Sequence, residues 1–123
     1  MYRIALVEDE KYNADRFCDI LKAYAQKENV EFQIQWYRDA LTFLEEYAEG
    51  VDIVFMDIRM PVMDGIQATE KIRTISLTVP IIAVTAYAFY TEQQQAIQAG
   101  CNAVISKPYS LERLRETIES YIG

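Results

Sequence analysis

Residues 51–57 read Val-Asp-Ile-Val-Phe-Met-Asp, and this nearly continuous apolar run is the clearest indication of the fold. A strand of a parallel sheet that is covered on both faces shows such a run instead of an alternation. Residues 81–84 read Ile-Ile-Ala-Val directly after a proline and show the same pattern. Shorter apolar runs at residues 4–7 and 103–105 predict two further strands.

Between these runs the pattern changes to helical spacing. Residues 30–36 alternate apolar and polar side chains, which predicts a half-buried strand near a sheet edge. Apolar residues with a helical period predict five helices, and Leu41 and Ile75 are expected on two of the apolar faces. The helices are expected at about residues 11–27, 39–50, 64–75, 91–99 and 110–121. Five βα units predict a three-layer α/β/α fold, with a flavodoxin-like, doubly wound, five-stranded parallel sheet in the order 2-1-3-4-5.

The composition excludes several classes of protein. The chain of 123 residues fits one domain, residues 1–123, and 51% of it is hydrophobic. Twelve basic against nineteen acidic residues give a net charge of −7, which argues against direct nucleic-acid binding and against an anionic membrane surface. The sequence has no histidine, which removes Ser-His and Cys-His catalysis and any role as a phosphohistidine donor.

Cysteine usage and hydropathy point to a cytoplasmic protein. Cys18 and Cys101 are too few for a disulfide framework or a zinc site. The sequence shows neither a signal peptide nor an apolar segment of transmembrane length, so we expect no membrane insertion.

Polar residues follow four of the predicted strands. They are Glu8 and Asp9 after the first, Asp57 after the third, Thr85 after the fourth and Lys107 after the fifth. The carboxyl ends of parallel strands meet at one edge, where ligands bind beside the reversal of strand order. Three carboxylates there favour Mg²⁺, with Mn²⁺ as a possible substitute, and leave a carboxylate oxygen of Asp57 to attack a phosphoryl group.

Each of these residues also has an ordinary structural explanation. Asp9 taken alone fits a turn, Thr85 a buried strand position, Lys107 a surface lysine and Asp64 a helix cap. Their joint placement at one sheet edge favours a site, because the independent explanations would all have to hold together.

At these residues the chain resembles the receiver domain of two-component response regulators, the chemotaxis-regulator-like family. The matching segments are residues 6–10 (LVEDE), 52–65 (DIVFMDIRMPVMDG), 79–86 (VPIIAVTA), 99–101 (AGC) and 106–109 (SKPY). Residues 60–69 (MPVMDGIQAT) and 85–89 (TAYAF) look more like receivers attached to hybrid sensor kinases.

The resemblance implies a phosphorelay function. Asp57 would accept a phosphoryl group from the phosphohistidine of a histidine kinase or phosphotransfer protein, and Thr85 and Lys107 would contact it. Mg²⁺ would be held by Glu8, Asp9, Asp57 and the backbone carbonyl of Arg59. The chain would catalyse its own phosphorylation and slow autodephosphorylation without conventional turnover, and would remain a monomer or form a weak dimer on phosphorylation. The family also implies a cis Lys107–Pro108 bond.

Two features depart from the commonest family pattern. Glu8 stands where an aspartate is usual, and Val104 stands three residues before the lysine, where many receivers carry a Tyr or Phe that swings inward. Tyr87 or Tyr109 is a candidate substitute for that ring. We also hypothesise that Arg59 and Tyr87 hinder the hydrolytic water and lengthen the life of the aspartyl phosphate.

Three other functions remain as alternatives. A pseudoreceiver would be a protein-interaction module without phosphorylation. A magnesium-dependent phosphatase would resemble Asp-x-Asp, but its second position is Arg59 here. A flavodoxin-like cofactor binder would need a phosphate loop after the first strand, where residues 8–10 are acidic. The sequence leaves the downstream target open.

Overall fold

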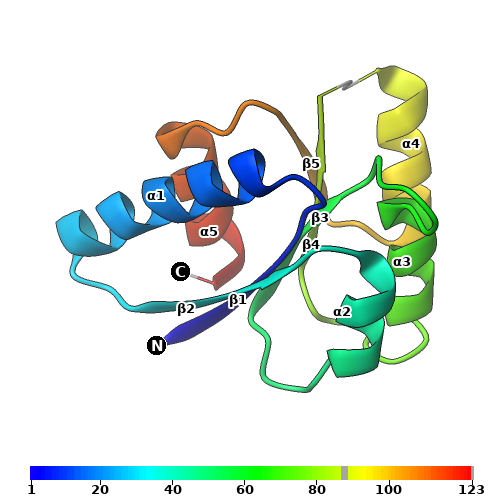
Figure 1. Ribbon diagram of the computed structural model, residues 1–123, viewed down its shortest axis with the longest axis horizontal. Coiled ribbons are helices and arrows are strands. Elements are labelled where there is room, and N and C mark those ends of the chain that lie inside the picture. Colours follow the sequence, from blue (N-terminus) through cyan, green and yellow to red (C-terminus); the bar gives the residue numbers. More distant parts are fainter. Residues whose placement is uncertain (87–88, 123) are drawn as a thin grey trace.

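The computed structural model describes residues 1–86 and 89–122, and within them five parallel strands form one sheet. Their order is β2-β1-β3-β4-β5, which confirms the predicted order (Figure 1). The strands are β1 (Tyr2–Val7), β2 (Phe32–Tyr37), β3 (Ile53–Asp57), β4 (Ile81–Thr85) and β5 (Ala103–Ser106). The helices are α1 (Lys11–Glu28), α2 (Ala40–Glu46), α3 (Gly65–Ile72), α4 (Tyr90–Ala99) and α5 (Leu111–Ile122).

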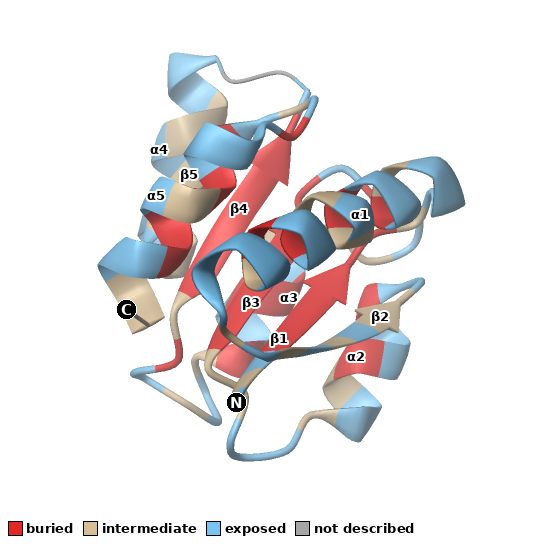
Figure 2. Cartoon of the chain, turned by 90° about the vertical axis from the view of Figure 1, so that its left-hand side faces the viewer, coloured by how far each residue is buried: buried red, intermediate tan, exposed pale blue. Residues whose placement is uncertain are grey.

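Helices cover both faces of the sheet, which explains the continuous apolar runs. Helices α1 and α5 lie on one face, and α2, α3 and α4 lie on the other (Figure 1). Along β3, Ile53 and Phe55 pack toward α1 and α5, while Val54 and Met56 pack toward the opposite helices. Every residue of β3 and β4 is buried (Figure 2), as expected for strands covered on both sides. No helix of the described part of the chain has the length and apolarity needed to cross a membrane.

The edge strand β2 begins later than predicted. Residues 32–37 pair with β1 and carry the expected half-buried alternation, but Val30 lies outside the strand. The backbone N–H of Val30 donates to the carbonyl of Ala25 at 3.1 Å, so Val30 belongs to the end of α1. Asn29 adopts the left-handed conformation with φ 53° and closes that helix, as C-terminal caps commonly do.

Helices α2 and α3 are shorter than predicted, and two of their expected apolar positions are wrong. The carboxylate of Asp39 accepts from the N–H of Thr42 at 2.7 Å and starts α2 in a register that buries Ala40 and Phe43. Leu41 therefore points outward and is 46% exposed. Ile75 lies beyond the end of α3 and is 61% exposed.

Arg73 joins the end of α3 to the connection between α4 and β5. Its Nε and one terminal nitrogen donate to the carbonyl of Gly100 at 3.0 and 2.7 Å. The guanidinium also reaches Asn102 Oδ1 at 2.9 Å and the carbonyl of Ser76 at 3.1 Å. Asn102 Oδ1 in turn accepts from the N–H of Ile81, the first residue of β4. This half-buried cation therefore ties together three segments at the amino edge of the sheet, opposite the edge where the strands end.

We expect Arg73→Ala to lower the free energy of unfolding by about 2 kcal/mol, because hydrogen bonds to a charged donor are lost and a part-buried carbonyl is left unpaired. Urea unfolding monitored by circular dichroism measures this. Arg16→Ala, at an exposed position of α1, is the control and should change stability little. Equal stability of the two variants would contradict the role of Arg73.

Candidate functional site

The carboxyl edge of the sheet brings the predicted polar residues together. Asp57 and Thr85 end β3 and β4, Glu8 directly follows β1, and Lys107 directly follows β5. The strand register places Asp57 opposite Val84, so Thr85 lies one residue further along the neighbouring strand. Strands β1 and β3, which carry the acidic residues, flank the point where the strand order reverses.

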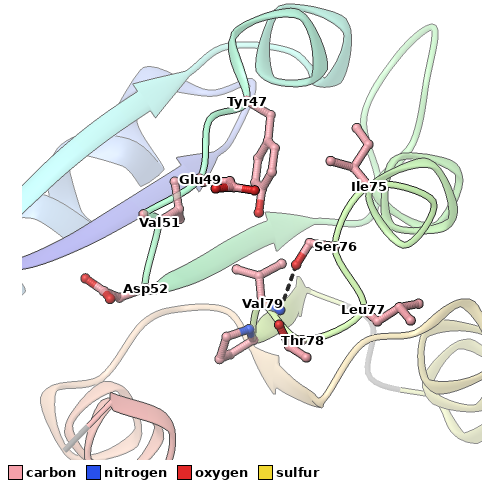
Figure 3. A pocket seen from close by; sticks show the side chains of 11 residues that line it. Tyr47, Glu49, Val51, Asp52, Ile75, Ser76, Leu77, Thr78 and Val79 are labelled. Atoms are coloured by element: carbon pink, nitrogen blue, oxygen red, sulfur yellow. Dashed lines mark hydrogen bonds between the residues drawn. The ribbon is translucent and has the colours of Figure 1, made fainter.

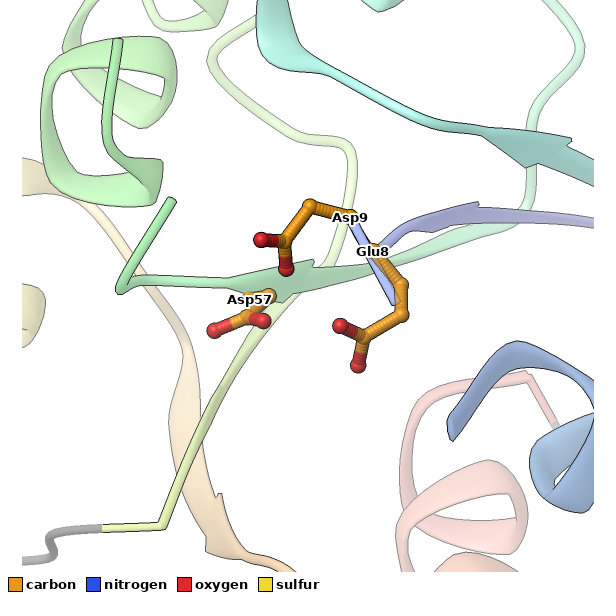
Figure 4. A group of neighbouring side chains, drawn as sticks. All are labelled: Glu8, Asp9 and Asp57. Carbon is orange, nitrogen blue, oxygen red and sulfur yellow. The ribbon is translucent and has the colours of Figure 1, made fainter. Parts of the chain in front are cut away.

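Three carboxylates converge at this edge. Glu8, Asp9 and Asp57 each offer an oxygen within 4.8 Å of the others, and Figure 4 shows the side chains turned toward one another. Glu8 and Asp57 are buried, whereas Asp9 is only half-buried. The cluster therefore has two acids in the protein interior and one toward solvent.

Lys107 supplies positive charge to the two buried acids. Its Nζ lies 2.9 Å from Glu8 Oε1 and 2.9 Å from Asp57 Oδ2. The next peptide bond, Lys107–Pro108, is cis, which confirms the isomer implied by the resemblance. One ammonium group thus faces two carboxylates, and the cluster as a whole keeps an excess of negative charge.

The electrostatics of the site follow from burial and from this charge ratio. Burial, reinforced by the nearby Asp57 and opposed by Lys107, raises the pKa of Glu8 to about 7. Burial alone would lower the pKa of Lys107, but the two carboxylates outweigh it and the pKa lies above its ordinary value. Both shifts indicate a site in which additional positive charge would be stabilising.

Two buried oxygens at this site have no hydrogen-bond partner among the described residues. They are Glu8 Oε1, which has only the ion-pair contact with Lys107, and the hydroxyl of Tyr109. Burial and the negative charges of Glu8 and Asp57 raise the pKa of Tyr109 above its ordinary value. A cluster of three carboxylates, two of them buried, fits a hard cation such as Mg²⁺.

The loop after β3 folds tightly back over Asp57. The backbone N–H of Arg59 donates to Asp57 Oδ1 at 3.1 Å, which holds the second oxygen of that carboxylate. A Cβ on Gly65 would lie 2.4 Å from the carbonyl oxygen of Asp57, so only glycine allows α3 to begin here. Asp64 caps α3 in a reciprocal capping box with Gln67, which confirms its predicted role as a cap.

Comparison with known proteins agrees with this geometry. The family described as "Response regulator receiver domain" matches residues 4–119. The chain belongs to this family.

Relatives of this receiver domain include both kinase-attached and small proteins. It is 41% identical over 83 residues to the sensor histidine kinase RcsC of Salmonella typhi, covering 68% of this chain but only 8% of the kinase. It is 34% identical to the polar-differentiation response regulator DivK of Brucella ovis, covering 98% of this chain and 95% of DivK. The chain thus spans a small fraction of the kinase and nearly all of DivK.

A solved structure resembles the receiver domain closely. It is the receiver domain of sensor histidine kinase PA1611 from Pseudomonas aeruginosa PAO1, with a TM-score of 0.85 and 30% identity over 99% of this chain and 98% of that one. That protein holds a magnesium ion in its active-site cleft.

Both departures from the common receiver pattern are visible in the structure. Glu8 reaches the acidic cluster despite its longer side chain. Val104 is half-buried on β5 and packs against the core on the side of α2, α3 and α4. Tyr109 is buried against Phe17, with ring centroids 5.2 Å apart, whereas Tyr87 lies outside the described residues.

Sequence reasoning missed two residues that contact this site. Trp36 donates its indole N–H to the backbone carbonyl of Glu8 at 2.8 Å, from the end of β2. Glu92, in the first turn of α4, accepts from Thr85 and from Arg59. No local pattern points to Trp36, and the only signal for Glu92 was a lone acid in a glutamine-rich helix.

A separate pocket lies away from this site. It has a volume of about 640 Å³ and is lined by residues that precede β3 and β4, at the opposite edge of the sheet (Figure 3). Its polar groups include Asp52, which accepts from the N–H of Arg3, and Ser76, which accepts from the N–H of Val79. These groups stabilise loops and form no reactive cluster.

The raised pKa of Glu8 predicts a pH dependence of stability. Without divalent metal, stability should fall as pH rises from 4.5 to about 7, because the folded state retains a proton that the unfolded chain releases. The fall is at most about 3 kcal/mol. Glu8→Gln should abolish this part of the profile, as measured by urea unfolding in EDTA.

Glu10→Gln is the matched control for this experiment, because Glu10 is an exposed neighbour of the same charge. It should keep the wild-type profile. A Glu8→Gln profile parallel to that of the wild type would contradict the assignment of the buried proton to Glu8.

Proposed function

We propose that this receiver domain accepts a phosphoryl group on Asp57 in a magnesium-dependent reaction and thereby changes a partner-binding surface. The observation that carries this proposal is Lys107 Nζ at 2.9 Å from both Glu8 and Asp57, beside the converging carboxylate of Asp9. A nucleophilic carboxylate, a cation beside it and an acidic metal cluster are the groups that phosphoryl transfer to an aspartate requires.

The residues of the chain have separate roles in this reaction. The Arg59 N–H on Oδ1 and Lys107 on Oδ2 fix the plane of the Asp57 carboxylate. One carboxylate oxygen attacks phosphorus as the phosphorus–nitrogen bond to the donor histidine breaks, and that imidazole keeps the electron pair. Lys107 neutralises charge on the incoming group, and the hydroxyl of Thr85 donates to a phosphoryl oxygen.

Glu8, Asp9, Asp57 and the backbone carbonyl of Arg59 would hold the metal. Bound Mg²⁺ would supply charge neutralisation for the carboxylates and the phosphoryl oxygens. Mn²⁺ takes the same oxygen ligands and would substitute.

The donor would be a histidine kinase or a histidine phosphotransfer protein, since the chain itself has no histidine. The match to RcsC supports a receiver domain that belongs to a hybrid kinase or acts with one. The match to DivK supports a small response regulator instead. We propose residues 1–123 as a single cytoplasmic receiver domain, monomeric or weakly dimeric when phosphorylated. It would catalyse its own phosphorylation and slow dephosphorylation.

Phosphorylation of Asp57 is tested by intact mass after incubation with Mg²⁺ and acetyl phosphate. We expect a single phosphoryl increment in the wild type, and none in Asp57→Ala or in EDTA. Asp15→Ala, at an exposed position of α1, is the control and should be modified like the wild type. A folded wild type without the increment would favour the pseudoreceiver alternative.

Metal binding is tested separately through Trp36, the single tryptophan, whose indole contacts the carbonyl of Glu8. Titration with Mg²⁺ should change its fluorescence, and Asp9→Asn should weaken the affinity by at least about tenfold. Glu10→Gln makes a charge change of the same size one residue away and should leave the affinity within about twofold. Equal weakening in both variants would show that only general charge attracts the cation.

A further inference from the structure

The carboxylate of Glu92 joins three segments around the site. Thr85 Oγ1 donates to Glu92 Oε1 at 2.5 Å, from the end of β4. Arg59, in the loop after β3, donates to Glu92 Oε2 from a terminal nitrogen at 2.6 Å and from Nε at 3.2 Å. The Glu92 side chain is only 13% exposed, whereas that of Arg59 is 56% exposed, so the contact with Thr85 is the more sheltered of the two.

Both donors also lie beside Asp57. Arg59 is two residues further along the chain and binds the Asp57 carboxylate through its backbone N–H. Thr85 lies next to Val84, the residue that pairs with Asp57 in the sheet. A phosphoryl group carries anionic oxygens, which a hydroxyl and a guanidinium bind at least as well as they bind a carboxylate. A phosphoryl group on Asp57 and the carboxylate of Glu92 would therefore compete for the same donors.

We propose that Glu92 is an autoinhibitory positioning residue, which holds Thr85 and Arg59 until a phosphoryl group on Asp57 takes them. We call the contacts of Glu92 with Thr85 and Arg59 the Glu92 latch. This inference rests on the proposed function, because it requires Asp57 to be the acceptor. Opening the latch removes the polar contacts that Glu92 makes from the first turn of α4.

The first turn of α4 is suited to respond when the latch opens. Ala96 is the one buried residue of α4. At the start of the helix, Phe89 and Tyr90 are 65% and 76% exposed, and the N-cap contributes no side-chain hydrogen bond. With so little apolar burial, this turn depends on polar contacts, and those of Glu92 are among them.

Beryllofluoride with excess Mg²⁺ is the probe, because it mimics an aspartyl phosphate without hydrolysing. We expect Glu92→Ala to bind it about tenfold more tightly than the wild type, since the competing acceptor is gone. Glu92→Gln retains an acceptor for Thr85 but loses the charge that pairs with Arg59, so its affinity should be intermediate. Glu112→Ala, an exposed acid at the start of α5, is the charge-matched control and should bind like the wild type.

A double-mutant cycle separates the latch from simple charge repulsion. In an Arg59→Ala background, the contacts between Arg59 and Glu92 are already absent. Glu92→Ala should therefore raise the affinity for beryllofluoride clearly less than it does alone. An undiminished gain would mean that Glu92 acts only through its negative charge, and would overturn the proposal.

Hydrogen exchange gives a readout that a purely structural role of Glu92 would not produce. Loading the wild type with Mg²⁺ and beryllofluoride should speed exchange in the first turn of α4, whereas Glu92→Ala should exchange fast before loading and change little. An affinity of Glu92→Ala equal to the wild type, or the same acceleration in both proteins, would overturn the latch alone. A folded wild type that takes up no beryllofluoride would refute the proposed function and the latch with it.

Discussion

Burial of two carboxylates at the ends of adjacent parallel strands is the constraint on which the site depends. Glu8 and Asp57 are both shielded from water, and a buried carboxylate is costly unless a cation or hydrogen-bond donors pair with it. Lys107 meets this need from β5, at the far side of the sheet from β1. The strand order and the covering helices therefore have a chemical consequence, because they bring Glu8 and Lys107 together although these residues lie about a hundred positions apart in the chain.

Much of this arrangement was predictable because it follows from backbone topology. The apolar runs around Phe55 and Ile82 require helices on both faces, and parallel strands deliver the residues that follow them to one edge. Glu8, Asp57, Thr85 and Lys107 could thus be grouped before any side-chain geometry was known. Metal binding and the reactions of these residues remain predictions.

The incorrect and missed predictions concern local features that hydrophobic periodicity does not encode. Val30 continues the alternating pattern, but its N–H donates to the carbonyl of Ala25 just after the left-handed cap of α1 at Asn29. Leu41 fitted a helical face, yet the cap at Asp39 rotated α2 so that Phe43 faces the core. The contacts of Trp36 and Glu92 depend on how far side chains reach between separate elements. A single sequence read by itself does not specify this.

The strands and helix α4 differ in how they are held at this site. Strands β3 and β4 are buried throughout, so the positions of Asp57 and Thr85 are fixed by the core. Helix α4 buries only Ala96 and meets the site through the polar side chain of Glu92. Val104 has no aromatic ring that could turn between an inward and an outward position, so a ring on β5 is not available to carry a signal. Under the proposed latch, a change of charge at Asp57 would therefore act first on the hydrogen bonds of Glu92, which connect α4 to the site.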